Sequence, residues 1–193
     1  MTLRATTLPV RDVSRDDMKT MFGLMNEYYL GVALSQFEEE FAEKDWVIVL
    51  RDEEGIWGFS TQSLFPHTVD GIDVLVVFSG DTVIHRTRRR SSALPVAWAR
   101  MMQGIHAAHS DRPLYWLLTT KGYKTYRYLP VFFKEYYPAM DKEPPLFVSA
   151  LARSLGASRY GERFDASTWI VRATEGMQRL RSGVAPITPG RRR

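Results

Sequence analysis

Residues 74–94, VLVVFSGDTVIHRTRRRSSAL, are the most informative segment because a strand-like apolar run leads directly into clustered arginines and two serines. The alternating valines and Phe78 predict a strand. Ser91 and Ser92 are good helix N-cap residues, and Pro95 is tolerated only in a first helical turn. Backbone N–H groups at a helix start attract an anion, and the arginines add positive charge. The segment therefore predicts a phosphate-binding loop, with a solvated basic loop as the alternative.

The residues after this loop predict a helix and then a second strand. Apolar side chains recur at steps of four and three from Leu94 to Ala108, which places them on one helix face. The Asp-Arg-Pro sequence at 111–113 ends that helix, and residues 114–119 have strand composition. A strand, helix, strand order favours a right-handed crossover, so we expect the two strands to be parallel.

The first 31 residues predict a strand followed by a helix. Residues 8–13 have the composition of a short strand, and Ser14 with Asp17 resembles a capping box. The following helix, which should end near Gly31, has methionine and aromatic side chains on one face. Such a stripe favours a core position over a ligand surface. Its members are Met18, Met21, Phe22, Met25, Tyr28 and Tyr29.

A second helix and an antiparallel hairpin are predicted next. Ser35 with Glu38 forms another capping box, which predicts a short acidic helix that reaches residue 44. Residues 46–50 and 56–61 have strand composition and are separated by an acidic, glycine-containing turn. The early sheet is therefore expected to be antiparallel. A looser segment that contains Pro66 should connect it to the strand before the arginines.

The C-terminal part carries weaker signals. Residues 123–138 are rich in tyrosine and phenylalanine, begin as a helix and should be interrupted at Pro130. A helix from the two prolines at 144–145 to residue 155 and a strand at 167–172 are also expected. Residues 1–180 are expected to form a single domain, and residues 181–193 a disordered basic tail.

Composition excludes several classes of protein. A chain of 193 residues with 45% apolar side chains can bury one full core. No apolar run approaches the roughly 20 residues of a membrane helix, and the N-terminus lacks a signal-peptide core, so we expect a cytoplasmic protein without a membrane partner. The chain has no cysteine, and its four histidines lack metal-site spacing, so no metal is expected.

The net charge of +4 does not indicate nucleic-acid binding. Three of the 26 basic residues are the terminal arginines, and without them 23 basic residues face 22 acidic ones. Most of the remaining basic character lies in residues 86–90. A local anionic ligand fits this distribution better than a long polyanion, so no nucleic-acid partner is expected.

The order of elements resembles the GNAT superfamily of acetyl-CoA-dependent N-acyltransferases over roughly Thr7 to Tyr137. The resemblance implies a mixed α/β fold. Its central twisted sheet is mostly antiparallel, is flanked by helices and is splayed between the fourth and fifth strands. It also implies acetyl-CoA or another acyl-CoA as co-substrate and a small-molecule or peptide amine as acceptor. A homodimer is possible, because dimers are common in the superfamily.

The same resemblance implies where acyl-CoA would bind. In the superfamily a Q/R-x-x-G-x-G/A loop wraps the coenzyme A pyrophosphate. Residues 88–93, RRRSSA, match its first and last positions, and Ser91 replaces the central glycine. A serine keeps the backbone N–H but narrows the allowed backbone geometry. The implied binding residues are Val83, Ile84, Arg88, Arg89, Arg90, Ser91, Ser92, Ala93 and Lys121, where Lys121 stands in place of the usual asparagine.

Acyl transfer to an amine requires a base for the amine and an acid for the departing thiolate. The resemblance implies Tyr128 as the acid, with Tyr126 close enough in the sequence to be confused with it, and Asp81 as the base, with His85 as second candidate. The structural alternatives are a core or groove tyrosine and a turn aspartate. Two other functions remain open: a non-catalytic GNAT-like protein that binds a ligand or partner, and a nucleic-acid-binding module that uses the arginines and tyrosines.

Overall fold

A computed structural model describes residues 2–174 and 177–184. The chain divides into two compact units. Unit 1 comprises Met1–Pro66, Val74–Thr119 and Gln178–Arg193, and unit 2 comprises His67–Asp73 and Thr120–Met177. The single domain expected over residues 1–180 stays a prediction. Most of the expected disordered tail, residues 185–193, lies outside the described residues.

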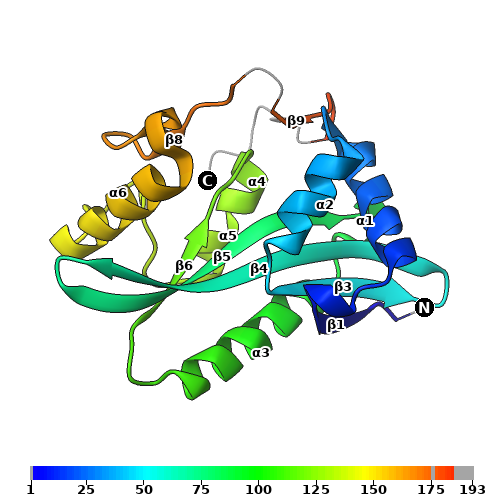
Figure 1. The fold of residues 1–193 in the computed structure, drawn as a ribbon, viewed down its shortest axis with the longest axis horizontal. Coiled ribbons are helices and arrows are strands. Elements are labelled where there is room, and N and C mark those ends of the chain that lie inside the picture. Colours follow the sequence, from blue (N-terminus) through cyan, green and yellow to red (C-terminus); the bar gives the residue numbers. More distant parts are fainter. Residues whose placement is uncertain (1, 175–176, 185–193) are drawn as a thin grey trace. The chain divides into compact units, whose positions relative to one another are not determined.

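Unit 1 is built on a five-stranded sheet with the order β1-β3-β4-β5-β6 (Figure 1). The strands are β1 (Arg4–Pro9), β3 (Trp46–Asp52), β4 (Gly55–Val69), β5 (Ile72–Ile84) and β6 (Leu114–Leu118). β3 pairs antiparallel with β1 and β4, and a tight turn with positive φ at Asp70 and Gly71 joins β4 to β5. β5 and β6 are parallel, as the strand, helix, strand order predicts. The mixed, mostly antiparallel sheet is confirmed.

Two strand predictions differ from the structure for identifiable reasons. The first strand occupies Arg4–Pro9, and the 3-10 helix η1 (Val10–Asp12) replaces the expected strand at 8–13. The ladder ends where Pro9 pairs with Trp46, the first residue of β3, and beyond it the Val10 N–H still donates to the Asp45 carbonyl at 3.1 Å. β4 continues through Pro66, where a looser segment was expected. Its pairing with β3 stops at Gln62, so the missing N–H of Pro66 breaks no bond to that neighbour.

Three helices cover the two faces of this sheet. α1 (Arg15–Tyr28) begins as predicted, with the Asp17 N–H donating to Ser14 Oγ at 3.1 Å. α2 (Leu34–Ala42) begins one residue before Ser35, and its N-cap residue, Ala33, offers no side-chain bond. The second capping box was therefore wrong. α3 (Ala93–Ala108) matches the predicted helix and packs against β1 and β3 on the face opposite α1 and α2 (Figure 1).

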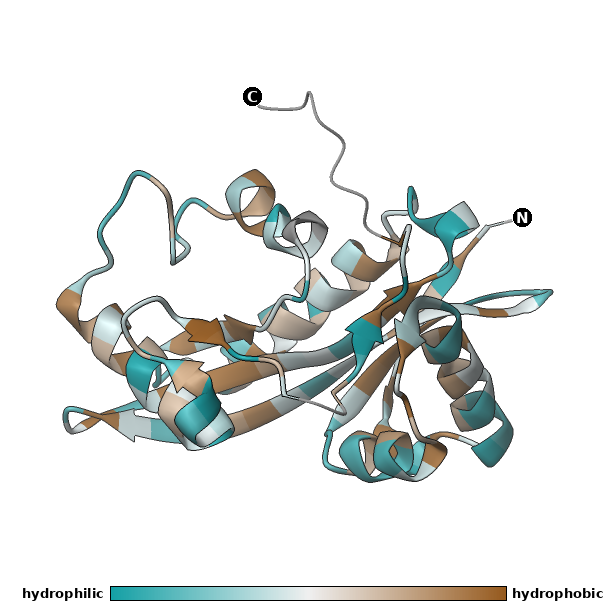
Figure 2. Ribbon diagram, turned by 90° about the horizontal axis from the view of Figure 1, so that it is seen from above, coloured by the Kyte–Doolittle hydropathy of each residue, from teal (hydrophilic) through white to brown (hydrophobic). Residues whose placement is uncertain are grey.

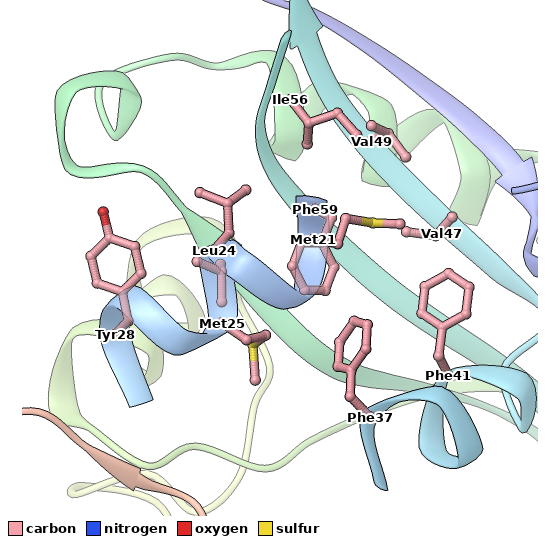
Figure 3. Close-up of a cluster of buried hydrophobic side chains, with 11 residues drawn as sticks. Met21, Leu24, Met25, Tyr28, Phe37, Phe41, Val47, Val49, Ile56 and Phe59 are labelled. Atoms are coloured by element: carbon pink, nitrogen blue, oxygen red, sulfur yellow. The ribbon is translucent and has the colours of Figure 1, made fainter. Parts of the chain in front are cut away.

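The main core lies between the sheet and helices α1 and α2 (Figure 3). Alternation along β3 directs Val47 and Val49 toward these helices, while Ile48 and Leu50 are buried on the α3 side. Colouring by hydropathy shows hydrophobic residues along the strands and both classes on the helices (Figure 2). The methionine and aromatic stripe of α1 belongs to this core, as predicted. The cluster is formed by Met21, Leu24, Met25, Tyr28, Phe37, Phe41, Val47, Val49, Ile56, Phe59 and Val83.

The remaining elements are short except for one helix. In unit 1, β2 (Tyr29–Leu30) pairs with β9 (Arg179–Leu180), and η2 (Arg86–Arg88) follows β5. Unit 2 contains α4 (Tyr123–Tyr126), α5 (Tyr128–Phe132), α6 (Leu146–Tyr160), η3 (Gly161–Arg163), β7 (Phe164–Asp165) and β8 (Ile170–Val171). α6 extends five residues beyond the predicted end, and the predicted strand at 167–172 reduces to β8. Among the described residues no helix is long and apolar enough to cross a membrane.

Candidate functional site

The sheet of unit 1 opens between β5 and β6. The two strands pair from Leu75 with Leu114 to Ser79 with Leu118, where β6 ends. β5 continues for five more residues, from Gly80 to Ile84, without a pairing to β6 in the described part of the chain. The sheet is therefore splayed at this point, as expected. On the open segment the Ile84 carbonyl accepts from Arg89 Nε at 3.3 Å.

A β-bulge lies at the start of this open segment. Ser79 Oγ donates to Gln62 Oε1 at 2.7 Å, and Thr82 Oγ1 lies 2.7 Å from Ser60 Oγ. Gln62 and Ser60 are two residues apart on β4, but their partners on β5 are three residues apart. One extra residue must therefore be inserted in β5, so that Gly80 and Asp81 together oppose a single residue of β4.

The bulge turns Gly80 and Asp81 toward the same face of the sheet. A Cβ atom on Gly80 would lie 2.5 Å from Oγ1 of Thr61, which is on the α1 and α2 face with Phe59. Val83, two residues after Asp81, also faces the core on this side. The pKa of Tyr29, the residue after α1, is raised by burial and by the charge of Asp81, while Arg89 acts in the opposite direction. The charge of the candidate base thus acts on the Tyr29 phenol.

The arginine loop between β5 and α3 is held by internal hydrogen bonds. The His85 N–H donates to the Trp57 carbonyl at 2.7 Å, and the Ser91 N–H donates to the Arg88 carbonyl at 3.0 Å. The Ala93 N–H donates to Ser91 Oγ at 3.1 Å. Ser91 therefore provides a side-chain bond at the start of α3, as its residue type suggested, although Ser92 occupies the N-cap position.

The guanidinium of Arg88 is bound by other side chains of the protein. Its Nη2 lies 3.0 Å from Asp52 Oδ2 and 3.5 Å from Glu54 Oε2, and its guanidinium lies over the Trp57 ring. Burial of Asp52 opposes ionisation, but hydrogen bonds from the Trp57 indole and the Glu54 N–H, together with Arg88, leave the pKa of Asp52 below its usual value. These contacts hold the arginine loop against the turn between β3 and β4. A role for Arg88 in pyrophosphate binding stays a prediction.

The other three arginines of the loop differ in their contacts. The Nε of Arg89 donates to the Ile84 carbonyl, and its guanidinium lies over the Tyr28 ring. Arg86 and Arg90 are exposed, and among the described residues their guanidinium groups have no hydrogen-bond or ion-pair partner. Two cations beside the start of α3 are therefore open to an anion. The backbone N–H of Arg86 donates to the Tyr28 hydroxyl at 2.9 Å, so the end of α1 supports the loop.

The second candidate base lies at the start of the arginine loop, and the candidate acid belongs to unit 2. His85 has Nδ1 2.8 Å from Thr87 Oγ1 and Nε2 3.8 Å from Glu27. Lys121 also belongs to unit 2, whereas Asp81 and the arginine loop belong to unit 1. Tyr128 is 41% exposed and stacks on Phe132.

Tyr126, the nearby alternative to Tyr128, donates its hydroxyl to the Pro138 carbonyl at 2.6 Å. Burial, Tyr136 and Asp141 raise the pKa of Tyr126. This phenol is therefore held within unit 2 by a hydrogen bond of its own. The described residues contain no group of three or more His, Cys, Asp or Glu that could hold a metal ion.

Sequence reasoning missed Tyr28, Tyr29 and the buried polar chain around Gln62 as parts of this site. Both tyrosines belonged to a stripe with core spacing, and Tyr28 is indeed 7% exposed. Nothing in that spacing shows that the Tyr28 hydroxyl reaches the arginine loop. For the polar chain a signal existed, because the Ser-Gly-Asp-Thr sequence at 79–82 interrupts an otherwise apolar strand.

Comparison with solved structures identifies the fold. AAC(6′)-Iy, in complex with the bisubstrate analogue CoA-S-monomethyl-acetylneamine, aligns with a TM-score of 0.52, 14% identity, and coverage of 75% of this chain and 99% of that chain. The ribosomal-protein-alanine N-acetyltransferase of Brucella melitensis aligns with a TM-score of 0.51, 11% identity, and coverage of 75% and 100%. The chain has the GNAT fold.

A third GNAT-fold neighbour is longer. It is a probable N-acyltransferase from Enterococcus faecalis, with a TM-score of 0.50 and 17% identity, and the match covers 66% of this chain but only 31% of that chain. No protein-family model matches the chain, and no curated protein matches it by sequence. At these identities the comparisons show that the fold is shared, and they do not show that the reaction is shared.

Proposed function

We propose that this chain transfers an acyl group from acyl-CoA, with acetyl-CoA as the first candidate, to an amine of a small molecule or peptide. The observation that carries the proposal is the open edge of β5, which leads directly into the arginine loop and the start of α3. Two arginines of this loop are exposed and have no side-chain partner among residues 2–174 and 177–184. The complex of the GNAT-fold neighbour AAC(6′)-Iy with a CoA-containing analogue supports a CoA-type co-substrate.

The residues present fit the coenzyme. Arg86 and Arg90 would hold the pyrophosphate together with the N-terminus of α3, where Ser92 and Ala93 lie. Arg88, which is paired with Asp52, would keep the loop in place. Arg89 would do the same through its hydrogen bond to the Ile84 carbonyl and its contact with the Tyr28 ring. The backbone of Val83 and Ile84 would bind the pantetheine arm along the open edge of β5. Lys121 of unit 2 remains a candidate contact on the resemblance alone.

The chemistry assigned to the side chains follows from the needs of the reaction. Acyl-CoA supplies a thioester, whose C–S bond breaks as a new C–N bond forms to the acceptor amine. Asp81 would remove the proton of the amine, directly or through a water molecule, because it is a carboxylate on the segment of β5 that extends beyond the end of β6. Backbone N–H groups near Val83 would stabilise the developing negative charge on the carbonyl oxygen. Tyr128 would return a proton to the thiolate.

Calorimetric titration with acetyl-CoA tests the binding step. We expect saturable one-to-one binding that weakens about tenfold or more in the Arg86→Ala/Arg90→Ala variant, because two charge-assisted contacts are removed. The matched control is Arg100→Ala, an exposed arginine of α3 outside the loop, which should bind like the wild type. Absence of wild-type binding at millimolar acetyl-CoA would overturn the acyltransferase proposal.

A non-catalytic ligand-binding protein is the second candidate, and one observation favours it. Ser91 occupies the place of a glycine, and its hydroxyl accepts the Ala93 N–H that would otherwise point toward a phosphate. Intact acetyl-CoA binding without thiol release, measured with a panel of amines, would identify this function. A nucleic-acid-binding module would instead show strongly salt-dependent affinity for oligonucleotides. A cytoplasmic location, a possible homodimer, and the absence of membrane and nucleic-acid partners stay predictions.

A further inference from the structure

A chain of hydrogen bonds centred on the buried Gln62 crosses three strands at the point where the sheet opens. The Trp116 Nε1–H on β6 donates to Ser79 Oγ at 2.8 Å, and Ser79 Oγ donates to Gln62 Oε1 at 2.7 Å. Gln62 Nε2 donates to Ser60 Oγ at 2.8 Å, and Ser60 Oγ lies 2.7 Å from Thr82 Oγ1. Gln62 is 0% exposed, so water does not compete for its two bonds. We call these five residues the Gln62 chain.

Chemistry sets the direction of the Gln62 chain as far as Ser60. An indole nitrogen can only donate, so the Ser79 hydroxyl accepts from Trp116 and donates to the Gln62 carbonyl oxygen. The Gln62 amide nitrogen then donates to Ser60. Between Ser60 and Thr82 either hydroxyl can be the donor. The Thr82 hydroxyl in turn points to the Gly80 carbonyl at 3.5 Å, so the chain ends on the bulge itself.

The two contacts of the chain with β5 are the ones that define the bulge. Ser79 lies before the extra residue and Thr82 after it, and Gln62 and Ser60 bind them from adjacent positions on one face of β4. In a regular antiparallel pair Asp81 would oppose Ser60. A slip of one residue reverses the face on which each following side chain lies. Asp81 would then leave the side of the sheet on which Tyr29 lies.

Stability alone does not explain a buried glutamine in a sheet. Replacing both partners of a buried hydrogen bond with apolar groups of the same shape is often neutral, whereas a half-satisfied chain is costly. Buried polar groups can instead specify one arrangement among competing ones. Here the competing arrangement is the regular register, in which neither Thr82 nor the Gly80 carbonyl would meet a partner from the chain.

We propose that Gln62 is a positioning residue: through the Gln62 chain it fixes the extra residue of β5 and thereby holds Asp81 on the face of the sheet that α1 and α2 cover. This inference rests on the proposed function for the role of Asp81, but the register itself can be measured without any substrate. The chain also reaches the helix that begins at the arginine loop, because the ring centres of Trp116 and Trp98 of α3 are 4.4 Å apart. The Gln62 chain therefore contacts both β5 and α3.

The test compares variants that remove the chain with variants that keep it. Gln62→Leu removes both central bonds at similar volume. Thr82→Val removes the exposed terminal hydroxyl, and Thr82→Ser keeps it, so this pair remains informative even if Gln62→Leu fails to fold. Thr61→Val is the control, because Thr61 is buried on the same strand and its Oγ1 has no hydrogen-bond partner among the described residues.

The readout is the cross-strand nuclear Overhauser effect from Ser60, which identifies the residue of β5 opposite to it. In the wild type, in Thr82→Ser and in Thr61→Val, we expect the residue opposite Ser60 to be residue 82. In Gln62→Leu and Thr82→Val, we expect it to be Asp81 in all or part of the molecules. Retention of the wild-type register in Gln62→Leu, or its loss in Thr61→Val, would overturn the proposal.

A second readout ties the register to turnover. If the wild type acylates an amine, Gln62→Leu should lower kcat at least tenfold and change the acetyl-CoA Kd less, because Arg86 and Arg90 are untouched. An unchanged kcat in a variant with a shifted register would overturn the positioning role. A wild type that does not bind acetyl-CoA would overturn the proposed function while the register measurement still decides whether Gln62 fixes the bulge.

Discussion

The Nη2 atom of Arg88 lies 3.0 Å from Oδ2 of Asp52, whose side chain is only 2% exposed. This contact uses the one arginine that the sequence motif would assign first to a phosphate. We expect Arg88→Ala to lower the free energy of unfolding, because the contact over Trp57 alone is worth about 0.5–1 kcal/mol and Asp52 would also lose its cation. Arg88→Lys should not restore it, since an ammonium lacks the planar stacking group. Urea denaturation measures both, and wild-type stability in Arg88→Ala would contradict the structural role.

The Tyr28 hydroxyl accepts the Arg86 N–H at 2.9 Å. Tyr28→Phe should cost about 1 kcal/mol, because it leaves a partly buried backbone donor without its partner. Hydrogen exchange at the Arg86 amide should accelerate in this variant while exchange in β3 stays slow. Equal acceleration in both places would mean that the variant loosens the whole unit.

Asp81 and Arg89 act on the Tyr29 phenol in opposite directions. Asp81→Asn should lower the pKa of Tyr29, because it removes a negative charge that disfavours the phenolate. Burial should still keep that pKa above the usual 10.0. Arg89→Ala should raise the pKa, because it removes a positive charge. Titration of the Tyr29 ring by NMR checks both signs, and a shift in the same direction in both variants would show that the charges do not act directly.

Gly80 cannot accept a side chain without a rearrangement. A Cβ atom there would lie 2.5 Å from Thr61 Oγ1 and 3.0 Å from Lys44 Cε. We expect Gly80→Ala to destabilise the protein by about 1–3 kcal/mol, as overpacking does. Thr61→Ala should recover part of that loss in the double variant, because it removes the closest atom. Additive effects in thermal denaturation would place the strain elsewhere.

The carboxyl group of Asp165 should make the stability of unit 2 depend on pH in the acid range. Hydrogen bonds from the Ser167 hydroxyl and N–H lower its pKa from 3.8 to about 2. A depressed folded-state pKa adds stability above the unfolded value, and that stability is lost as the pH falls from 3.8 toward about 2. Asp165→Asn should therefore be less stable than the wild type at pH 6, and the difference should narrow below pH 4. A difference that does not change with pH would contradict this origin.

Local chemistry made much of unit 1 predictable. The bond from Asp17 to Ser14, the apolar spacing of α3 and the parallel pairing of β5 and β6 all follow from residue type and order. The cap expected at Ser35 failed because α2 begins one residue earlier, and a side-chain pattern cannot choose between two adjacent starts. Pro66 was interpreted as a break because sequence does not show that β4 has lost its β3 neighbour at that position.

The candidate site was less predictable than the fold. Residue type located the arginine loop, but which arginines are open depends on acidic and aromatic groups more than 30 residues away, such as Asp52 and Trp57 for Arg88. The bulge at Gly80 depends on hydrogen bonds between strands, which a single strand does not encode. The roles of Asp81 and Tyr128 in catalysis stay predictions.

The hydrogen bonds from Trp116 through Ser79 and Gln62 to Ser60 constrain how this sequence can change over time. Ser79 accepts from Trp116 and donates to Gln62, whose amide donates to Ser60, so altering one of these residues leaves its neighbour without a partner. A single substitution is then harmful even where a fully apolar set would be tolerated. Gln62, Ser60, Ser79 and Trp116 should therefore be inherited as one epistatic unit, kept together or replaced together along a lineage.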